Sequence, residues 1–386
     1  MSTLLTLFRR EFHRIAIDPL AWFCMFVGPL LTAVFFLSMM DEGAPRKIPV
    51  GIVDEDNTSI SRLIVRNLDA FPELNVSNSY PTITLARQAV QRGEIYGFYY
   101  IPYGVTQQAN AMKVPTISFY MNRSALMASS MVYKDMTMLS ELISAAATRK
   151  VLYAKGASKE QALAFLQPIA VKSYATNNPS LNFNIYLSNM LISGIFGLFV
   201  MMFTVYSVGN EIKYRTGKEW LIKGRGSITQ ALIGKFLPHI LIYMIVAAAY
   251  LLFLDGIGNF PFNGGLWRAY LMFMTYVLAC MGLGTFFITL LPALRLGLSA
   301  ASLWSMLSFS MAGFTFPFLA LPQLIQAATG LFPLRHFYIL YCNTTLNGFP
   351  LLNTAPSLYA LLAFAMLPVF SAWRLKQVLL NVKYIP

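Results

Sequence analysis

Long runs of apolar residues, separated by short polar and basic stretches, dominate the pattern of this chain. Six runs hold about 20 residues each, the length that a helix needs to cross the ~30 Å hydrocarbon core of a bilayer. Their positions are 19–40, 185–208, 231–254, 267–291, 296–320 and 354–373. The pattern predicts an α-helical polytopic membrane protein with six transmembrane helices, the last five within residues 184–373.

Two polar segments flank these runs. In residues 1–18, leucine and phenylalanine alternate with arginine and glutamate, which is typical of an amphipathic helix lying on a membrane surface. The run that follows, 19–40, is too long for a signal peptide and ends without the small residues of a cleavage site. We therefore interpret it as a transmembrane helix preceded by a cytoplasmic interface helix, and we interpret residues 374–386 as a cytoplasmic tail.

Residues 41–183 differ from the rest, because charges of both signs are frequent and no run is long enough to span a bilayer. Short stretches rich in β-forming residues alternate there with apolar residues at helical spacing. The expected strands are 49–53, 74–76, 96–101 and 116–121, and the expected helices are 60–71, 85–90 and 124–155. This alternation predicts a water-soluble α/β domain with a mainly parallel sheet, inserted between the first two transmembrane helices.

The segment between the last two runs, residues 322–345, is apolar but contains a helix-breaking Pro333 and a charged Arg335. Irregular backbone at membrane depth requires protein neighbours that satisfy its polar groups. We therefore expect a re-entrant segment here rather than a further span.

Basic residues predict the orientation, because short loops rich in lysine and arginine stay in the cytoplasm. They concentrate in the N-terminal segment, in the loop 209–230 and in the C-terminal tail, whereas the short loops of the opposite side have few. Both termini are therefore expected in the cytoplasm and residues 41–183 outside. Long domains cross a membrane largely regardless of their charge, so the balanced charge of that block is no obstacle.

Composition supports a membrane protein and excludes other classes. The chain is 56% hydrophobic and 12% charged, about half the charge of a typical soluble protein. A net charge of +13 is also found in nucleic-acid-binding proteins, but no basic module with interleaved aromatic residues is present, so no nucleic-acid partner is expected. The three cysteines are isolated in the sequence, so neither a metal site nor a disulfide framework is predicted.

Catalytic motifs are absent from the sequence as well. No phosphate-binding loop of the G-x-x-x-x-G-K-S/T type occurs, so this chain is not expected to bind ATP. His13, His239 and His336 are scattered, and we interpret each as an interfacial or loop residue rather than a ligand or a base. The centres of the six runs lack ionisable residues, which argues against a proton-coupled carrier. A transporter of this kind needs an external energy source.

The loop after the second run is the candidate functional site, because it combines mixed charge with a tryptophan where topology alone requires only basic residues. The residues concerned are Glu211, Arg215, Thr216, Lys218, Glu219 and Trp220. One interpretation is a short amphipathic helix, anchored at the membrane surface by Trp220, that offers its charges to a cytosolic partner. The other is a plain basic loop, and periodicity alone does not choose between them.

This loop resembles the coupling element of ABC-2 type transporter permeases, in which a charged signature precedes a Gly-Lys pair. The matching pieces are Glu211, Arg215-Thr216, Lys218-Glu219-Trp220-Leu221 and Gly234-Lys235-Phe236. Arg215 stands where the family usually has glycine, and one residue is added before Glu219. Other segments resemble family signatures in the same order along the chain, namely 53–59, 178–183, 312–317 with 321–322, and 332–338. The multidrug-type exporters with a large extracytoplasmic domain are the most similar subfamily.

The resemblance implies the membrane-spanning permease subunit of an ATP-binding-cassette exporter in a bacterial inner (plasma) membrane. Such a subunit moves an amphipathic or hydrophobic substrate outward and binds no cofactor itself, because ATP and Mg²⁺ bind to a separate cytosolic ABC ATPase subunit. The other implied partners are the lipid bilayer, a second permease subunit (a second copy or a related paralogue) and a periplasmic adaptor. The alternative is a non-transporting envelope assembly protein or receptor whose external α/β domain binds a partner.

Two sets of residues in the second and fifth runs are candidates for more specific roles. Aromatic and methionine side chains can line an adaptable apolar path, and small residues allow helices of two subunits to approach closely. The candidates for a translocation path are Phe199, Met202, Tyr206, Phe309 and Phe314. The candidates for a subunit interface are Gly194, Gly197, Ser299, Ser302 and Ser305. Lipid-facing packing of the first set and packing within one subunit for the second are open alternatives.

Overall fold

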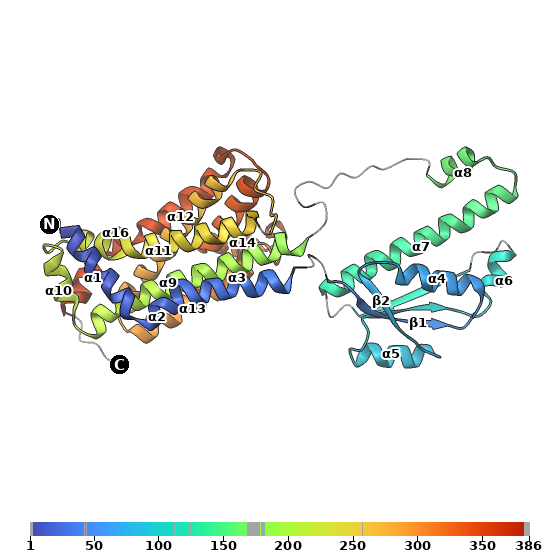
Figure 1. Cartoon of the computed structure of the whole chain (residues 1–386), viewed down its shortest axis with the longest axis horizontal. Coiled ribbons are helices and arrows are strands. Elements are labelled where there is room, and N and C mark those ends of the chain that lie inside the picture. The colour runs from blue at the N-terminus through green and yellow to red at the C-terminus, as the bar shows by residue number, and fades with distance from the viewer. Residues whose placement is uncertain are drawn as a thin grey trace. The chain divides into compact units, whose positions relative to one another are not determined.

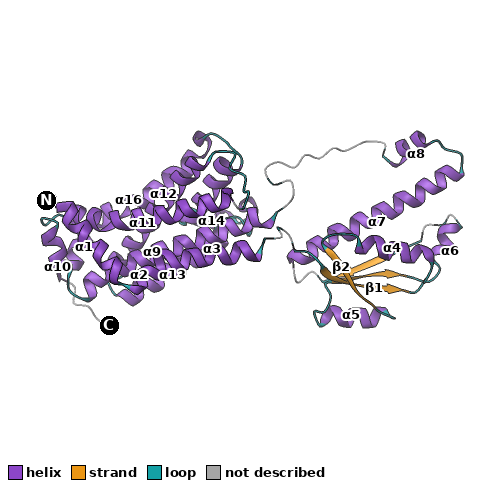
Figure 2. Cartoon of the chain, viewed as in Figure 1, coloured by secondary structure: helices purple, strands orange, loops and turns teal. Residues whose placement is uncertain are grey.

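The structure is a computed structural model of the chain. It describes residues 3–41, 43, 45–111, 113, 115–122, 126–167, 178, 182–256 and 258–381. Residues 179–181 of the 178–183 motif and residues 382–386 of the tail therefore lie outside the described residues. The chain divides into two compact units, residues 1–41 with 176–386 and residues 42–175 (Figure 1). The first unit consists of helices, and the second combines helices with the sheet (Figure 2).

The α/β unit contains the four strands that the sequence predicts. They are β1 (Ile48–Asp54), β2 (Leu74–Ser79), β3 (Gly97–Ile101) and β4 (Ser118–Met121). Their order in the sheet is β2-β1-β3-β4, with β1 parallel to both β2 and β3 and with β4 antiparallel to β3. The prediction of a mainly parallel sheet is therefore confirmed.

Helices cover both faces of this sheet. The helices α4 (Ser59–Asp69) and α7 (Leu126–Ala154) pack on the face that receives Val50 and Ile52, and α5 (Ile83–Gln91) packs on the opposite face. The two faces alternate along β1 because successive side chains of a strand point to opposite sides. Two short helices, α6 (Val105–Asn110) and α8 (Lys159–Leu166), are additional to the predicted ones.

In the helical unit, five of the described helical segments are long and apolar enough to cross a membrane. The first joins α2 (Pro19–Trp22), a π-helical turn (Phe23–Val27) and α3 (Gly28–Met39). The others contain α9 (Asn189–Lys213), α11 (Ile228–Gly256), α12 (Leu266–Leu290) and α16 (Ala355–Asn381). They correspond to predicted runs one, two, three, four and six.

The remaining predicted run, 296–320, contains the shorter helix α13 (Leu294–Met311). This helix ends early because Gly313 adopts a left-handed conformation with φ of 100°, and Pro317 follows. The predicted end of the run at residue 320 is therefore wrong for the helix, and whether α13 crosses the membrane stays a prediction.

The segment predicted to be re-entrant consists of short helices, α14 (Gln323–Thr329) and α15 (Pro333–Leu340), followed by a π-helical turn (Tyr341–Leu346). It returns to the middle of α13, because Trp304 donates a hydrogen bond from Nε1 to the carbonyl oxygen of Leu331 over 3.2 Å. The rings of Trp304 and Phe332 also lie 4.9 Å apart. This path agrees with a re-entrant element, although its depth in a bilayer stays a prediction.

Close helix packing in this unit depends on glycine. A Cβ atom at Gly282 in α12 would lie 2.1 Å from the carbonyl oxygen of Phe364 in α16. Only glycine allows two helix backbones to approach this closely. The long helices are thereby held as one packed body, with α1 (Thr3–Ile17) and α10 (Gly217–Lys223) at one end, close to the end of α16 (Figure 1).

Candidate functional site

The N-terminal helix α1 buries a stripe that contains a carboxylate. Leu7, Glu11 and Ile15 follow at intervals of four residues, so they share one face of the helix, and all three are buried. Gly234 of α11 accommodates this face, since a Cβ atom there would lie 2.5 Å from Cβ of Leu7. Helix α1 therefore packs directly on α11 and brings Glu11 into the interior of the protein.

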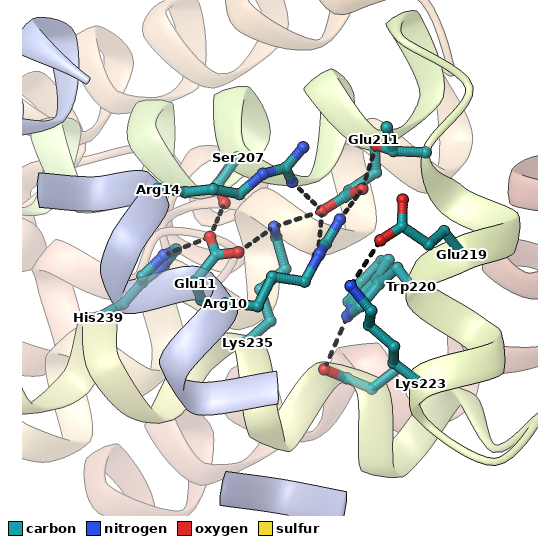
Figure 3. Close-up of polar contacts among 12 residues, drawn as sticks. Arg10, Glu11, Arg14, Ser207, Glu211, Glu219, Trp220, Lys223, Lys235 and His239 are labelled. Carbon is teal, nitrogen blue, oxygen red and sulfur yellow. Dashed lines mark hydrogen bonds and ion pairs between the residues drawn. The ribbon is translucent and has the colours of Figure 1, made fainter. Parts of the chain in front are cut away.

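Three side chains surround the Glu11 carboxylate there (Figure 3). Lys235 Nζ lies 2.8 Å from Oε2, Ser207 Oγ donates to Oε1 over 2.8 Å, and His239 Nε2 lies 3.1 Å from Oε1. Burial alone would raise the pKa of Glu11, but the charge of Lys235 and the contact with His239 outweigh it and hold the pKa below its ordinary value. Glu11 is therefore an anion that is paired inside the protein.

A second buried carboxylate, Glu211, lies near the end of α9. Arg10 pairs with both of its oxygens, from Nη1 over 2.8 Å and from Nη2 over 2.9 Å, and Lys235 Nζ lies 3.0 Å from Oε1. Arg14 and the hydroxyl group of Thr216 also donate to it. Lys235 contacts both carboxylates, so it joins the two halves into one set of residues, which we name the charge cluster: Arg10, Glu11, Arg14, Ser207, Glu211, Thr216, Lys235 and His239 (Figure 3).

The charge cluster contributes more to fixing the position of α1 than to the net free energy of folding. Removing charges from water costs several kcal/mol each, and attraction inside the protein repays this only when geometry is good and all partners are present. Loss of one partner from a buried pair typically costs about 3–5 kcal/mol, because the other charge is left uncompensated. The charge cluster therefore favours a single position of α1 against α9 and α11.

Helix α10 is tied to the same cluster through Trp220. The ring of Trp220 is fully buried, its Nε1 donates to the carbonyl oxygen of Ala231 over 3.2 Å, and Lys235 Nζ lies 5.1 Å from the ring centroid. The expectation that Trp220 anchors the loop at the membrane surface is therefore wrong, because the ring is enclosed by protein. Its burial instead fixes α10 against the start of α11.

Three of the four remaining predicted coupling residues face solvent. Arg215, Lys218 and Glu219 are exposed, and Glu219 pairs with Lys223 over 2.6 Å, which lowers the pKa of Glu219. Arg215 has a positive φ of 59°, a conformation that glycine adopts most easily, and this explains why glycine suits this position in the resembling signature. The predicted set thus has a buried part (Glu211 and Trp220), an exposed part and the half-buried Thr216 between them.

The five candidates for a translocation path have different neighbours in the structure. Phe199 packs against Phe23 with ring centroids 6.0 Å apart, and Phe314 is buried beside Tyr338. Tyr206 borders a cavity of about 360 Å³ beside the charge cluster, formed by residues of α1, α2, α9 and α11. Met202 and Phe309 are half-buried in their helices, so a path through all five stays a prediction.

The structure corrects the interface candidates in part. A Cβ atom at Gly194 would lie 2.4 Å from the Phe309 ring, and one at Gly197 would lie 2.1 Å from the Tyr276 hydroxyl oxygen. Ser305 is buried as well, with its Oγ 3.7 Å from the sulfur atom of Met201. These three positions therefore pack within the subunit, whereas Ser299 is exposed and Ser302 half-buried, so both stay candidates.

Sequence reasoning missed most of the charge cluster. We expect His239 at an interface or in a loop, but it is fully buried in α11, where its ring contacts Glu11. Two signals existed in the sequence: Glu11 is in register with Leu7 and Ile15, and Lys235 and His239 are four residues apart within an apolar run. Neither signal names its partner.

The arrangement of the charged side chains also bears on metal binding. Within the part of the chain that the structure describes, no three histidine, cysteine, aspartate or glutamate side chains are grouped so that they could hold a metal ion. The carboxylates of the charge cluster are instead occupied by lysine and arginine.

These features define a polytopic membrane protein in which a surface helix and a short loop helix are fixed to long apolar helices by buried charges. The sequence model of ABC-2 family transporter proteins matches residues 20–374, and the chain belongs to this family. It is thus a membrane-embedded transporter protein. No curated protein matches the chain significantly.

Proposed function

We propose that this chain is the membrane-spanning permease subunit of an ATP-driven exporter. It moves an amphipathic or hydrophobic substrate outward across a bacterial inner membrane, and a separate cytosolic ABC ATPase subunit binds ATP and Mg²⁺. Membership of the ABC-2 transporter family supports this proposal and disfavours a non-transporting assembly protein or receptor.

The observation that carries the proposal is the attachment of α10 to the long helices at two points. Thr216, directly before α10, donates to Glu211 of α9, and Trp220 of α10 bonds to Ala231 of α11. Arg10 and Arg14 of α1 hold the same Glu211. A displacement of α10 is therefore transmitted to α1, α9 and α11 together, which is what a coupling element requires.

The outer face of α10 is suited to the ATPase partner. Lys218, Glu219 and Ile222 lie on it at a spacing of three or four residues, and Ile222 is 76% exposed. An exposed apolar side chain between charges is typical of a protein contact. We therefore propose Ile222, rather than Trp220, as the apolar anchor of the docking site.

Both termini are proposed to lie in the cytoplasm, with α13 as the sixth span. The end of α16 packs beside α10, where Leu379 contacts Gly217 and Lys376 Nζ donates to the carbonyl oxygen of Gly226 over 2.8 Å. Helix α1 packs near the start of α11, through Leu7 and Gly234, and α10 also contacts the start of α11 through Trp220. An even number of spans accounts for both ends meeting there.

The direct test is reconstitution in inside-out vesicles, with the candidate ATPase subunit present or absent and an amphipathic dye as cargo. We expect ATP-dependent uptake of the dye only when both proteins are present, and no ATP hydrolysis by the permease alone. Uptake that needs no ATPase, or a failure of every co-expressed ABC ATPase to copurify, would contradict the proposal.

A further inference from the structure

Among the described residues of the helical unit, one buried charged side chain takes no part in the charge cluster. Arg335 lies in the first turn of α15 and is 8% exposed. Its guanidinium group lies over the ring of Phe318, 3.8 Å from the centroid. Within the described residues, no carboxylate and no hydrogen-bond acceptor pairs with this guanidinium group.

The chain itself has little to offer as a partner for this cation. No aspartate or glutamate follows Asp255 in the sequence. Of the acidic residues of the helical unit, Glu11 and Glu211 belong to the charge cluster, Glu219 pairs with Lys223, and Asp18 accepts a hydrogen bond from the backbone N–H of Leu20. Asp41 and Asp255 are exposed at the ends of α3 and α11. No described carboxylate of the helical unit therefore supplies a counter-charge for Arg335.

A glycine of the loop after α13 lies beside the guanidinium group of Arg335. The backbone of α15 begins beside Trp304 in the middle of α13, and the guanidinium group extends towards the loop after α13. A Cβ atom at Gly313 in that loop would lie 3.2 Å from Nη1, so a side chain at this position would crowd the guanidinium group. Glycine, which adopts the φ of 100° found here without strain, leaves Nη1 uncrowded.

The chemistry of the guanidinium group indicates what kind of molecule Arg335 would bind. A buried cation without a counter-charge is unfavourable, and such a group in a membrane protein is by default a binding-site candidate. Guanidinium is planar and offers a fork of N–H donors that matches phosphate and carboxylate, while an aromatic ring can cover its flat face, as Phe318 does. The apolar side chains of Phe316 and Leu319, which flank Phe318 in the sequence, and of Leu324 in α14 are exposed and suit an aliphatic chain.

We propose that Arg335 binds the anionic group of an amphipathic molecule, namely a phosphate, sulfate or carboxylate attached to an apolar chain. Two sources share this chemistry: a phospholipid of the bilayer and an exported amphipathic anion. The second source rests on the proposed export function, whereas the first does not.

Binding of dodecyl phosphate to the purified full-length chain in a neutral maltoside detergent tests this proposal, with native mass spectrometry as the readout. Arg335→Gln is the test variant, and Arg268→Gln, at an exposed arginine in the first turn of α12, is the matched control. We expect the wild type and Arg268→Gln to bind alike and Arg335→Gln to bind about ten-fold more weakly or worse, because a charge-assisted hydrogen bond is lost. Arg335→Lys should be intermediate, since an ammonium group lacks the fork.

Equal binding by Arg335→Gln and the wild type would overturn the proposal. If Arg335→Gln does not elute as a folded protein, Phe318→Leu replaces it: this variant keeps the charge but removes the covering ring, so binding should weaken, and unchanged binding counts against the site.

Nanodiscs of phosphatidylglycerol, compared with nanodiscs of phosphatidylcholine, separate the two sources. Phospholipid retained by the wild type and lost from Arg335→Gln would assign a bilayer lipid, whereas binding of dodecyl phosphate without retained phospholipid would assign an exported anion. Binding of neither overturns the proposal. The ATPase subunit is absent from these measurements, so a failure of ATP-driven transport leaves their outcome unaffected.

Discussion

Glu11 of the N-terminal helix and Lys235 of α11 form a buried ion pair of 2.8 Å, although they are 224 residues apart in the sequence. Because Lys235 also contacts Glu211 and the face of Trp220, this one ammonium group connects α1, α9, α10 and α11.

The first prediction concerns the pair itself. Lys235→Met should lower the free energy of unfolding by about 3–5 kcal/mol, because the buried carboxylate of Glu11 loses its lysine partner. Glu11→Gln should cost less, about 1–3 kcal/mol, because Lys235 keeps its ion pair with Glu211. The double variant should lose less than the sum of the two, by about 1–3 kcal/mol, as expected of residues in contact. Unfolding in detergent measures this double-mutant cycle.

The exposed pair Glu219 and Lys223, changed in the same way, is the control and should give a coupling energy close to zero. Strictly additive losses of stability for Glu11 and Lys235 would show that the two side chains do not interact.

The second prediction separates the buried and exposed parts of the coupling segment. Trp220→Ala should reduce the yield of folded protein, since truncating a fully buried tryptophan typically costs about 3–5 kcal/mol. Combined replacement of Lys218, Glu219 and Ile222 by alanine should leave folding intact but weaken copurification with the ATPase subunit. As a control, Arg295→Ala removes another exposed charge, in the first turn of α13. Full ATPase binding by the triple variant would mean that α10 is not the docking site.

The third prediction concerns the contact between α12 and α16. Gly282→Ala would place a Cβ atom 2.1 Å from a backbone oxygen that cannot rotate away, so the helices must separate. Overpacking of this kind costs about 1–3 kcal/mol. Gly256→Ala is the control, because a Cβ atom there meets nothing within 4 Å. We expect a clearly lower melting temperature for the first variant only. Similar melting temperatures for both would contradict the close contact.

The fourth prediction is a pH dependence of the α/β unit. Asp135 of α7 is 2% exposed, its Oδ2 has no hydrogen-bond partner within the described residues, and burial, with a contribution from the charge of Glu73, raises its pKa to about 6. The folded state therefore holds a proton that the unfolded chain releases near pH 4, so stability falls as pH rises from about 4 to 6. Asp135→Asn should remove this slope and stabilise the protein above pH 6 by about 2 kcal/mol.

Melting temperatures of the full-length chain from pH 4 to pH 8 test the Asp135 prediction. Glu141→Gln, an exposed change on the same helix, is the control and should melt like the wild type throughout. A wild type and an Asp135→Asn variant with parallel pH profiles would refute the assignment.

Hydrophobic periodicity by itself indicated which segments of this protein form the long apolar helices and which form the sheet. The length of apolar runs indicated the membrane helices, because a helix in lipid must satisfy its own backbone and expose about 20 apolar residues. The alternation of short strands and helices indicated the sheet and its mainly parallel order, since consecutive parallel strands need a crossover helix. Gly313 and Pro317 even contained the signal for the early end of α13, which the length of the apolar run concealed.

Only the tertiary structure decided which charges meet. Periodicity shows that Glu11 shares a face with Leu7 and Ile15, but the partner on that face comes from a helix more than 200 residues later. Periodicity likewise shows that Trp220 lies on the apolar face of a short amphipathic helix. It does not show whether this face contacts lipid or, as in the structure, Ala231 of α11. The physical reason is that helical spacing determines the direction of a side chain about its own axis, whereas ion pairs and close glycine contacts depend on which helices pack together and at what height.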